Sequence, residues 1–217
     1  MNTQTLINHF YDDGSKVFFT SDTHFNHHNI IRVAHRPFAD VNQMNDTIIK
    51  NWNMKVPEDA TVFHLGDFAF TTPYYVRQLL TKLHGTIHLI IGNHDWKMIR
   101  DNLVNDFASV SQQVSIIVCG QRILLNHYPM LCYAGAYHTP AQWQLFGHVH
   151  SRPEYYKDLE HNTDGLDIPR LTMLMPTQYD VGVDNNGYAP ISFPELKQII
   201  EKQIHEYNER KNTTVAS

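Results

Sequence analysis

Three short runs of β-branched and aromatic residues, each ending in a polar motif, constrain the fold of this chain more than any other feature. They span Lys16 to Ser21, Thr61 to Leu65 and Thr86 to Ile91, and runs of this length and composition are typical of buried strands. Apolar residues at helical spacing predict helices between them, at about Val41 to Asn53 and Pro73 to Leu83. This alternation of strand and helix predicts a largely parallel sheet in an α/β fold.

A different pattern follows Asp95. Strand-like runs are expected at Phe107 to Val110, Val114 to Val118 and Arg122 to Leu125. Residues 119–121, with the sequence Cys-Gly-Gln, are typical of a tight turn between the last two runs. These two runs are therefore expected to form an antiparallel hairpin in a second sheet.

The last third of the chain predicts few regular elements before its final helix. Short strands are expected at Gln144 to Phe146 and Tyr179 to Val183, and the stretch from Ser151 to Gln178 is expected to be a long loop. Residues 192–195, Ser-Phe-Pro-Glu, have the spacing of a capping box and predict the start of a helix. That helix is expected to fray from about Lys211.

The length of the chain favours one domain over residues 1–217, because cores usually divide only in longer chains. The net charge is −5 with only 17 lysine and arginine residues, so no strong nucleic-acid patch is expected. No apolar run approaches the roughly 18 residues of a membrane span, and the N-terminus lacks the pattern of a leader peptide. We therefore expect a cytoplasmic protein without a membrane partner, with Cys119 and Cys132 as reduced thiols.

Polar motifs rich in metal-ligand side chains stand where the predicted strands end. Binding sites in open α/β sheets form beyond the carboxyl ends of the strands, so these motifs are expected to converge on one cleft. Their carboxylate, amide and imidazole groups form a mixture suited to manganese, iron, zinc or nickel. The motifs are Asp22-Thr23-His24, Gly66-Asp67, Gly92-Asn93-His94-Asp95, His127 and Gly147-His148-Val149-His150.

The local spacing of these motifs supports the same interpretation. Asp22 and His24 are two residues apart, and side chains at that spacing in an extended segment point to the same side, so one cation could bind both. Glycine before Asp67, Asn93 and His148 permits close approach of the backbone. Each motif alone is more often a turn or an ordinary polar residue, whereas the whole set at strand ends favours a metal site.

On these residues the chain resembles the calcineurin-like metallophosphoesterases, whose five ordered motifs it matches from roughly Ser21 to His150. It looks most similar to small single-domain phosphoesterases of bacteria and phages, on the segments Asp22 to Phe25, Asn29 to Ile31, Arg36 to Phe38 and Asn51 to Asn53. The resemblance implies two packed mixed β-sheets flanked by helices, as a four-layer αββα sandwich. Many relatives have a further aspartate directly after the Gly-Asp motif, where this chain has phenylalanine.

The resemblance also implies a ligand set and a mechanism. Two divalent metal ions, with manganese favoured, would be held by Asp22, His24 and His150 and by Asn93, His127 and His148, with Asp67 bridging them. A hydroxide between the metals would attack the phosphorus. His94 would act as general acid, and Asp95 would orient its imidazole.

The substrate implied is a small phosphorylated or nucleotide-like molecule, more readily a phosphodiester because no cap domain is evident. A phosphomonoester is the alternative, and a non-catalytic metal-binding scaffold with the same fold is another. His27 and Arg36 are candidates for binding substrate phosphate, against the alternatives that His27 caps a loop and Arg36 pairs with a carboxylate. The aromatic residues Tyr128, Tyr133, Tyr137 and Trp143 could stack on a nucleobase, although core packing is the favoured interpretation.

Overall fold

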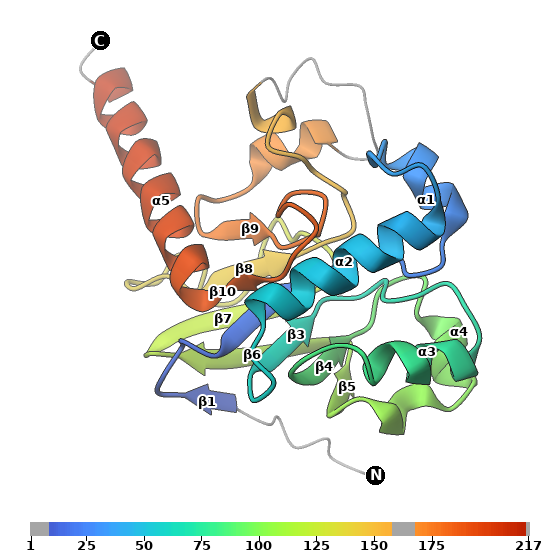
Figure 1. Ribbon diagram of the computed structural model, residues 1–217. Coiled ribbons are helices and arrows are strands. Elements are labelled where there is room, and N and C mark those ends of the chain that lie inside the picture. Colours follow the sequence, from blue (N-terminus) through green and yellow to red (C-terminus); the bar gives the residue numbers. More distant parts are fainter. Residues whose placement is uncertain (1–8, 158–167, 216–217) are drawn as a thin grey trace.

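Two five-stranded sheets form the centre of the molecule and are flanked by helices (Figure 1). The structure is a computed structural model and describes residues 9–157 and 168–215. The first sheet has the order β10-β2-β3-β4-β5, with β10 antiparallel to β2 and all other pairs parallel. Its strands are β2 (Val17–Thr20), β3 (Thr61–His64), β4 (Thr86–Ile90), β5 (Ser109–Ser111) and β10 (Ile191–Ser192).

The second sheet contains the predicted hairpin, since β6 and β7 pair antiparallel. Its order is β1-β6-β7-β8-β9, and the other pairs are parallel. The run predicted at Phe107 to Val110 overlaps β5, which pairs with β4 in the first sheet. The strands of the second sheet are β1 (His9–Tyr11), β6 (Gln113–Val118), β7 (Gln121–Asn126), β8 (Trp143–Phe146) and β9 (Gln178–Asp180).

Four helices follow strands of the first sheet, and their ends have clear local causes. The Asp40 side chain accepts hydrogen bonds from the N–H groups of Asn42 and Gln43 and so caps the start of α2. The helix predicted from Pro73 ends at Leu80, three residues earlier than expected. These helices are α1 (His28–Val33), α2 (Val41–Lys55), α3 (Pro73–Leu80) and α4 (Trp96–Arg100).

The final helix, α5 (Phe193–Val215), begins at the predicted capping box, because the Glu195 carboxylate accepts bonds from the backbone N–H and hydroxyl of Ser192. The expectation that this helix frays from about Lys211 was wrong, since the helix continues to Val215. Lys211 lies 4.8 Å from the centre of the Tyr207 ring, a contact between successive turns. Short 3₁₀ turns occur at Leu103–Asp106, Tyr155–Lys157 and Ile168–Met173. No described helix is long and apolar enough to cross a membrane.

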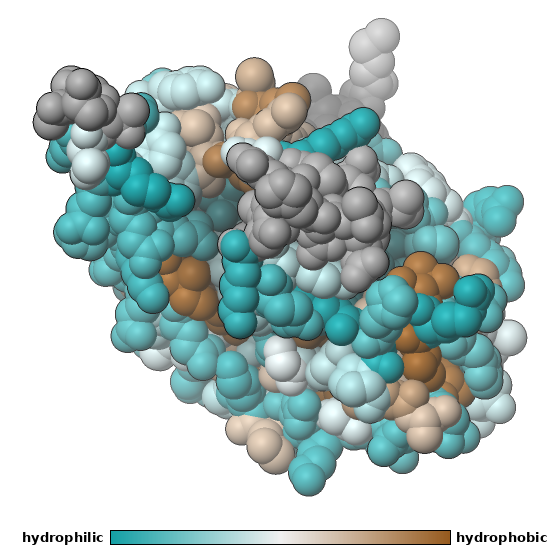
Figure 2. Space-filling view, turned by 90° about the horizontal axis from the view of Figure 1, so that it is seen from above, coloured by the Kyte–Doolittle hydropathy of each residue, from teal (hydrophilic) through white to brown (hydrophobic). Residues whose placement is uncertain are grey.

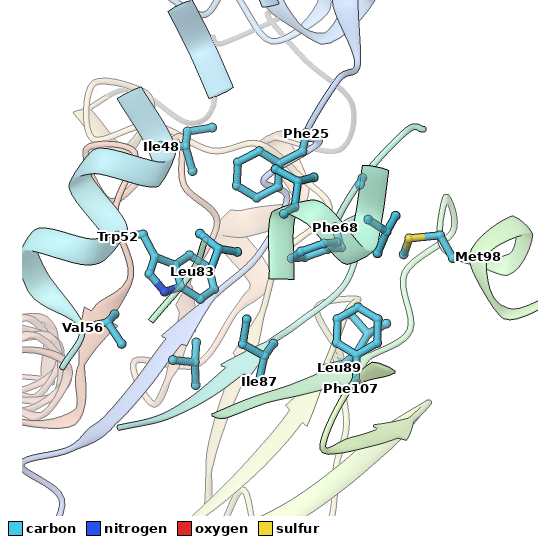
Figure 3. Packing of buried hydrophobic residues seen from close by; sticks show 14 of the residues in the cluster. Phe25, Ile48, Trp52, Val56, Phe68, Leu83, Ile87, Leu89, Met98 and Phe107 are labelled. Atoms are coloured by element: carbon cyan, nitrogen blue, oxygen red, sulfur yellow. The ribbon is translucent and has the colours of Figure 1, made fainter. Parts of the chain in front are cut away.

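Side chains of the first sheet alternate between two hydrophobic cores. Phe18 of β2 packs with the helices, whereas Val17 and Phe19 pack against the second sheet and α5. Figure 3 shows the helical core, where Trp52 of α2 points toward Ile87 of β4. Both faces of this sheet are therefore buried, as is usual for parallel strands.

Candidate metal centre

Two groups of aspartate and histidine side chains meet beyond the ends of four strands. Asp22, His24 and His150 form one group, and Asp67, His127 and His148 form the other. Within each group the ligand atoms lie within 4.8 Å of one another. The loops after β2, β3, β7 and β8 supply these residues.

Asp67 belongs to the second group and also approaches the first. Its Oδ2 atom is 3.5 Å from His24 Nε2 and 3.6 Å from His127 Nε2. Asn93, from the loop after β4, joins the second group, because its Oδ1 atom is 3.0 Å from His127 Nε2 and 2.9 Å from His148 Nδ1. All seven residues predicted as metal ligands are therefore gathered in one place.

Backbone and carboxylate partners determine which imidazole nitrogens face the centre. His127 Nδ1 is 2.7 Å from the Leu65 carbonyl oxygen and must donate to it, which leaves the Nε2 lone pair toward Asp67. His150 Nδ1 is 2.9 Å from Asp184 Oδ2, and its Nε2 atom is 3.9 Å from Asp22 Oδ1. Such outer hydrogen bonds commonly orient metal-binding histidines.

Several polar atoms of the centre lack hydrogen-bond partners and are spaced as the ligands of a cation would be. Asp22 Oδ1 and His24 Nε2 are buried and have no hydrogen-bond partner among the described residues. Buried polar atoms are nearly always bonded, so two such atoms in one cluster indicate a missing partner. Ligands about 2.1 Å from a shared cation lie roughly 3 to 4 Å apart, which matches the spacings here.

Burial shifts the protonation of these groups. Burial, and then the charge of Asp22, raise the pKa of Asp67 to about 7. Burial and the neighbouring His150 lower the pKa of His24 well below its usual range, which favours the neutral imidazole that binds metals. For His150 burial acts in the same direction, but the hydrogen bond to Asp184 and the charges of Asp22 and Asp184 together outweigh it and raise the pKa.

Five of the ligand residues have left-handed backbone conformations. They are Asp22, His24, Asp67, His148 and His150, with φ angles between 48° and 73°. This conformation costs a residue with a side chain roughly 1 to 2 kcal/mol, and such strain gathers at functional sites. The expected extended pincer at Asp22 and His24 was therefore wrong, because tight turns bring these side chains together.

Two glycines allow the loops to approach closely, as predicted. A Cβ atom on Gly147 would overlap the side chains of Ser21 and Asp22, and one on Gly92 would overlap the Asp67 carboxylate. A larger residue at either position would displace a ligand loop.

Asp95 does not orient His94, which corrects the prediction. Its carboxylate accepts hydrogen bonds from the backbone N–H groups of Asp67, Phe68 and Gly92, at 2.8 to 2.9 Å. These bonds use both oxygens and join the loop after β3 to the loop after β4. Asp95 therefore acts on the shape of the site through the backbone.

His94 lies beside the first group and belongs to neither group of possible ligands. Its ring centre is 5.4 Å from that of His24 and 5.8 Å from that of His27. Its backbone N–H donates to Asp67 Oδ1 at 2.8 Å, which holds the residue against the centre. Burial lowers the pKa of its imidazole, against the opposing charge of Asp95.

The two residues proposed to bind substrate have different surroundings. His27 remains next to the centre, with its Nδ1 atom 3.1 Å from His24 Nδ1 and its ring stacked on Phe70 at 4.6 Å. Arg36 is buried and binds Asp184 through two nitrogen atoms, at 2.9 and 2.8 Å. It also donates to the Asp22 carbonyl oxygen at 2.6 Å. Because protein atoms occupy its guanidinium, Arg36 supports the first metal loop, and its expected contact with substrate was wrong.

Sequence reasoning missed Asp184, which connects Arg36 to His150. Although burial raises its pKa, the charges and hydrogen bonds of Arg36 and His150 hold it well below the usual range. Asp184 follows the strand β9 and a glycine, Gly182, and so repeats the pattern of the ligand motifs. That position could have identified it as a candidate.

The two packed sheets flanked by helices are consistent with a metallophosphoesterase-type α/β sandwich, and the paired Asp/His groups give it two possible metal sites. No family model matches the chain. It is 31% identical over 189 residues to the uncharacterized protein MJ1445 of Methanocaldococcus jannaschii, with 86% of this chain and 92% of that protein covered. The chain belongs to the same family as MJ1445.

Two further similarities agree with this placement. Gene 66 protein of Mycobacterium phage L5 is 28% identical over 163 residues, which cover 63% of this chain and 78% of the phage protein. The crystal structure of AQ665, a protein of unknown function from Aquifex aeolicus, aligns with a TM-score of 0.59 and 26% identity. The alignment covers 84% of this chain and 98% of the Aquifex chain, so the likeness extends over most of this chain.

Proposed function

We propose that this protein is a metal-dependent phosphoesterase with two divalent cations. Asp22, His24 and His150 would hold one cation, and Asn93, His127 and His148 the other, with Asp67 bound to both. The observation that carries the proposal is the convergence of five loops on one cluster whose buried acceptor atoms lack partners.

The bound cations would supply positive charge to the phosphate oxygens and make a bound water more acidic. His94 would hold a proton on its imidazole for the departing ester oxygen, since it stands beside the cluster without belonging to either group. Asp67 would position His94 through the backbone bond that it accepts. His27 would keep the His24 ring oriented through their contact.

A phosphodiester suits the site better than a phosphomonoester. A monoester carries nearly two negative charges at neutral pH, and sites for such groups usually direct arginine at the oxygens. Arg36 cannot serve in this way because its guanidinium is buried against Asp184 and the Asp22 carbonyl. The single negative charge of a diester needs less compensation.

The donor set of carboxylate, amide and imidazole groups suits manganese, iron, zinc or nickel, and we propose manganese because carboxylate and carbonyl oxygens are the ligands that it favours. Metal analysis of protein purified without added metal, followed by titration of the chelated protein, would test the choice. Two ions per chain are expected.

Hydrolysis assays on manganese-loaded protein would test the proposed activity. Bis(p-nitrophenyl) phosphate, p-nitrophenyl phosphate and cyclic nucleotides form a suitable panel, with chelated protein as the control. The diester should be cleaved fastest, and chelation should abolish turnover. A protein that holds two metals and cleaves none of them would be a metal-binding scaffold, contrary to the proposal.

A further inference from the structure

Two cavities adjoin the metal centre, and hydrophobic side chains line much of each. The first has a volume of about 300 Å³ and is lined in part by Tyr128, Leu131, His148, Leu171, Met173 and Leu174. The second has a volume of about 220 Å³ and is lined in part by Ala69, Phe70, Thr72, Tyr75, His94 and Met98. We call them the His148 cavity and the His94 cavity.

The cavities meet different parts of the centre. They share no lining residue. A row of contacting side chains connects the two cavities. It begins at His94, which lines its own cavity and whose ring contacts that of His24, and His24 Nε2 in turn approaches Asp67. The row continues from Asp67 to His127 and then to the ring of His148, which lines the other cavity. A group bound at Asp67 would therefore have one cavity at each end of this row.

Exposed hydrophobic side chains concentrate in these cavities. Eleven large hydrophobic residues are exposed in the described part of the chain, and five of them line one cavity or the other. The face in Figure 2 is mostly hydrophilic, with hydrophobic residues in small separate patches. Apolar side chains beside a polar reaction centre are typical of sites that bind the organic part of a ligand. The five residues are Phe70, Tyr75, Tyr128, Leu131 and Met173.

The size and lining of the cavities indicate what they hold. A cavity of about 150 Å³ can accommodate a benzene ring, and both cavities here are larger. Each has at least one tyrosine in its wall, which favours a flat ring through stacked or edge contacts. Each also has one basic side chain, Arg170 or Lys97, which suits polar substituents on the ring.

We infer that the substrate is a phosphodiester with a ring-bearing group on each side of the phosphate. One ring would occupy the His148 cavity and the other the His94 cavity. This inference rests on the proposed function, since it places the phosphate at the metal centre. A monoester has only one organic group and would leave one cavity unfilled.

Binding of three simple diesters tests the inference without turnover. Isothermal titration should be carried out on manganese-loaded His94→Ala protein, which lacks the proposed proton donor, with dimethyl, methyl phenyl and diphenyl phosphate, which carry zero, one and two rings. We expect each added ring to tighten binding about tenfold. Equal affinities for the three would overturn the inference, even if the protein hydrolyses phosphodiesters.

Paired substitutions locate the two rings. Tyr75→Leu and Tyr128→Leu remove a ring from each cavity, whereas Tyr74→Leu and Tyr137→Leu alter exposed tyrosines that line neither. The first two should each weaken binding of diphenyl phosphate about three- to tenfold, which corresponds to the usual value of an aromatic contact. Their combination should weaken it by the product of the two factors, and both control variants should bind as the unaltered protein does.

The outcomes separate the two proposals. Metal content of each variant must be measured, because the Tyr128 ring also contacts that of His148. Loss of affinity in only one of the two variants would overturn the two-sided arrangement. Ring-dependent binding without hydrolysis of any ester would support the cavities as ligand sites and contradict the proposed activity. Hydrolysis of a phosphodiester with no dependence of binding on the number of rings would support the proposed activity and contradict the cavities as ligand sites.

Discussion

The His150 imidazole is held between Asp22 and the buried pair of Asp184 and Arg36. Asp184 Oδ2 is 2.9 Å from His150 Nδ1 and 2.8 Å from Arg36 Nη2, and both side chains of the ion pair are fully buried. Arg36 in turn donates to the carbonyl oxygens of Asp22 and Thr23. One carboxylate therefore positions ligands on two separate loops.

Replacing Asp184 by Asn should weaken the first metal site and the fold together. The change leaves the Arg36 charge buried without a counter-ion, which typically costs 3 to 5 kcal/mol, and outer partners of metal ligands are worth roughly 10- to 100-fold in affinity. Urea unfolding of chelated protein and manganese titration would measure the two effects. As a control, Asp106→Asn breaks the partly exposed pair with Arg77 and should cost about 1 kcal/mol or less. Equal losses in both variants would contradict the role given to Asp184.

Substitutions of His94 and Asp67 are expected to have different effects, the first on turnover and the second on metal content. His94→Ala should lower turnover by roughly 10² to 10⁴ with nearly unchanged metal content, because this residue is assigned to proton transfer. Asp67→Ala should instead lose both cations, since its carboxylate approaches a histidine of each group. Metal analysis beside kinetic assays would separate these outcomes. Metal loss in His94→Ala, or full occupancy in Asp67→Ala, would refute the respective assignment.

His64 is a fully buried core histidine, and its hydrogen bonds determine its tautomer. Its Nδ1 atom accepts from the Gly66 N–H, and its Nε2 atom is 2.9 Å from Thr23 Oγ1. The Thr23 hydroxyl donates to the Phe68 carbonyl oxygen, so Nε2 must carry the hydrogen and donate to Thr23. A second proton on the ring would break the bond to Gly66. Burial lowers the pKa of His64 to about 3, although the charge of Asp22 opposes this shift.

The neutral His64 should make the protein less stable in mild acid. The unfolded chain binds a proton at this ring near pH 6.5 while the folded chain does not, so stability is complete above that pH and falls as the pH drops toward 3. Between pH 7.5 and 5.5 this residue should cost about 1.4 kcal/mol. Urea unfolding of chelated protein should show that loss disappear in His64→Gln. The same change at His205, whose side chain is exposed, is the control for the substitution itself.

At the scale of elements, the site depends on loops that are tied to one another. Asp95 joins the loops after β3 and β4, and the Asp22 carboxylate accepts a bond from the His148 N–H and so joins the loops after β2 and β8. Strand pairing brings these loops to one edge of the sheets, but it does not fix the positions of residues within each loop. These carboxylates set the finer positions.

Asp95→Asn should loosen the centre, because an amide can replace only one of the two accepting oxygens. Asp95 Oδ2 accepts two bonds and Oδ1 one, so at least one backbone N–H would lose its partner, at about 1 to 3 kcal/mol each. Asp40→Asn is the matched control, since Asp40 caps α2 with a single oxygen and asparagine caps equally well. Unfolding free energies of the chelated proteins would compare them. A loss in Asp40→Asn as large as that in Asp95→Asn would contradict this account.

For the whole molecule, metal binding and folding should be coupled, because the ligands come from loops that only the folded chain brings together. At a metal concentration a hundred times Kd, each site adds about 2.7 kcal/mol to stability. Chelation should therefore lower the Tm by roughly 10 to 20 °C for two sites in a chain of this size. Differential scanning calorimetry with and without chelator would measure the shift, and Asp67→Ala should show little of it. An unchanged Tm for the native chain would contradict metal binding to the folded state.

The sequence by itself determined the parallel strands, the hairpin and the positions of the motifs that carry the candidate metal ligands, because each depends on residues that are neighbours in the chain. Asp22 and His24 directly follow a strand, and Gly147, His148 and His150 directly follow another. Parallel pairing then brings such ends to one edge, whatever the loops do in detail.

Only the tertiary structure determined the hydrogen-bond and ion-pair partners of the side chains around the site. Arg36 and Asp184 are 148 positions apart, and nothing local distinguishes an arginine that binds phosphate from one that binds a buried carboxylate. Asp95 stands next to His94 in the chain, yet the backbone N–H groups of two loops lie nearer to its oxygens. Hydrogen bonds depend on distances of a few tenths of an ångström between loops, and those distances follow from the packing of the whole chain.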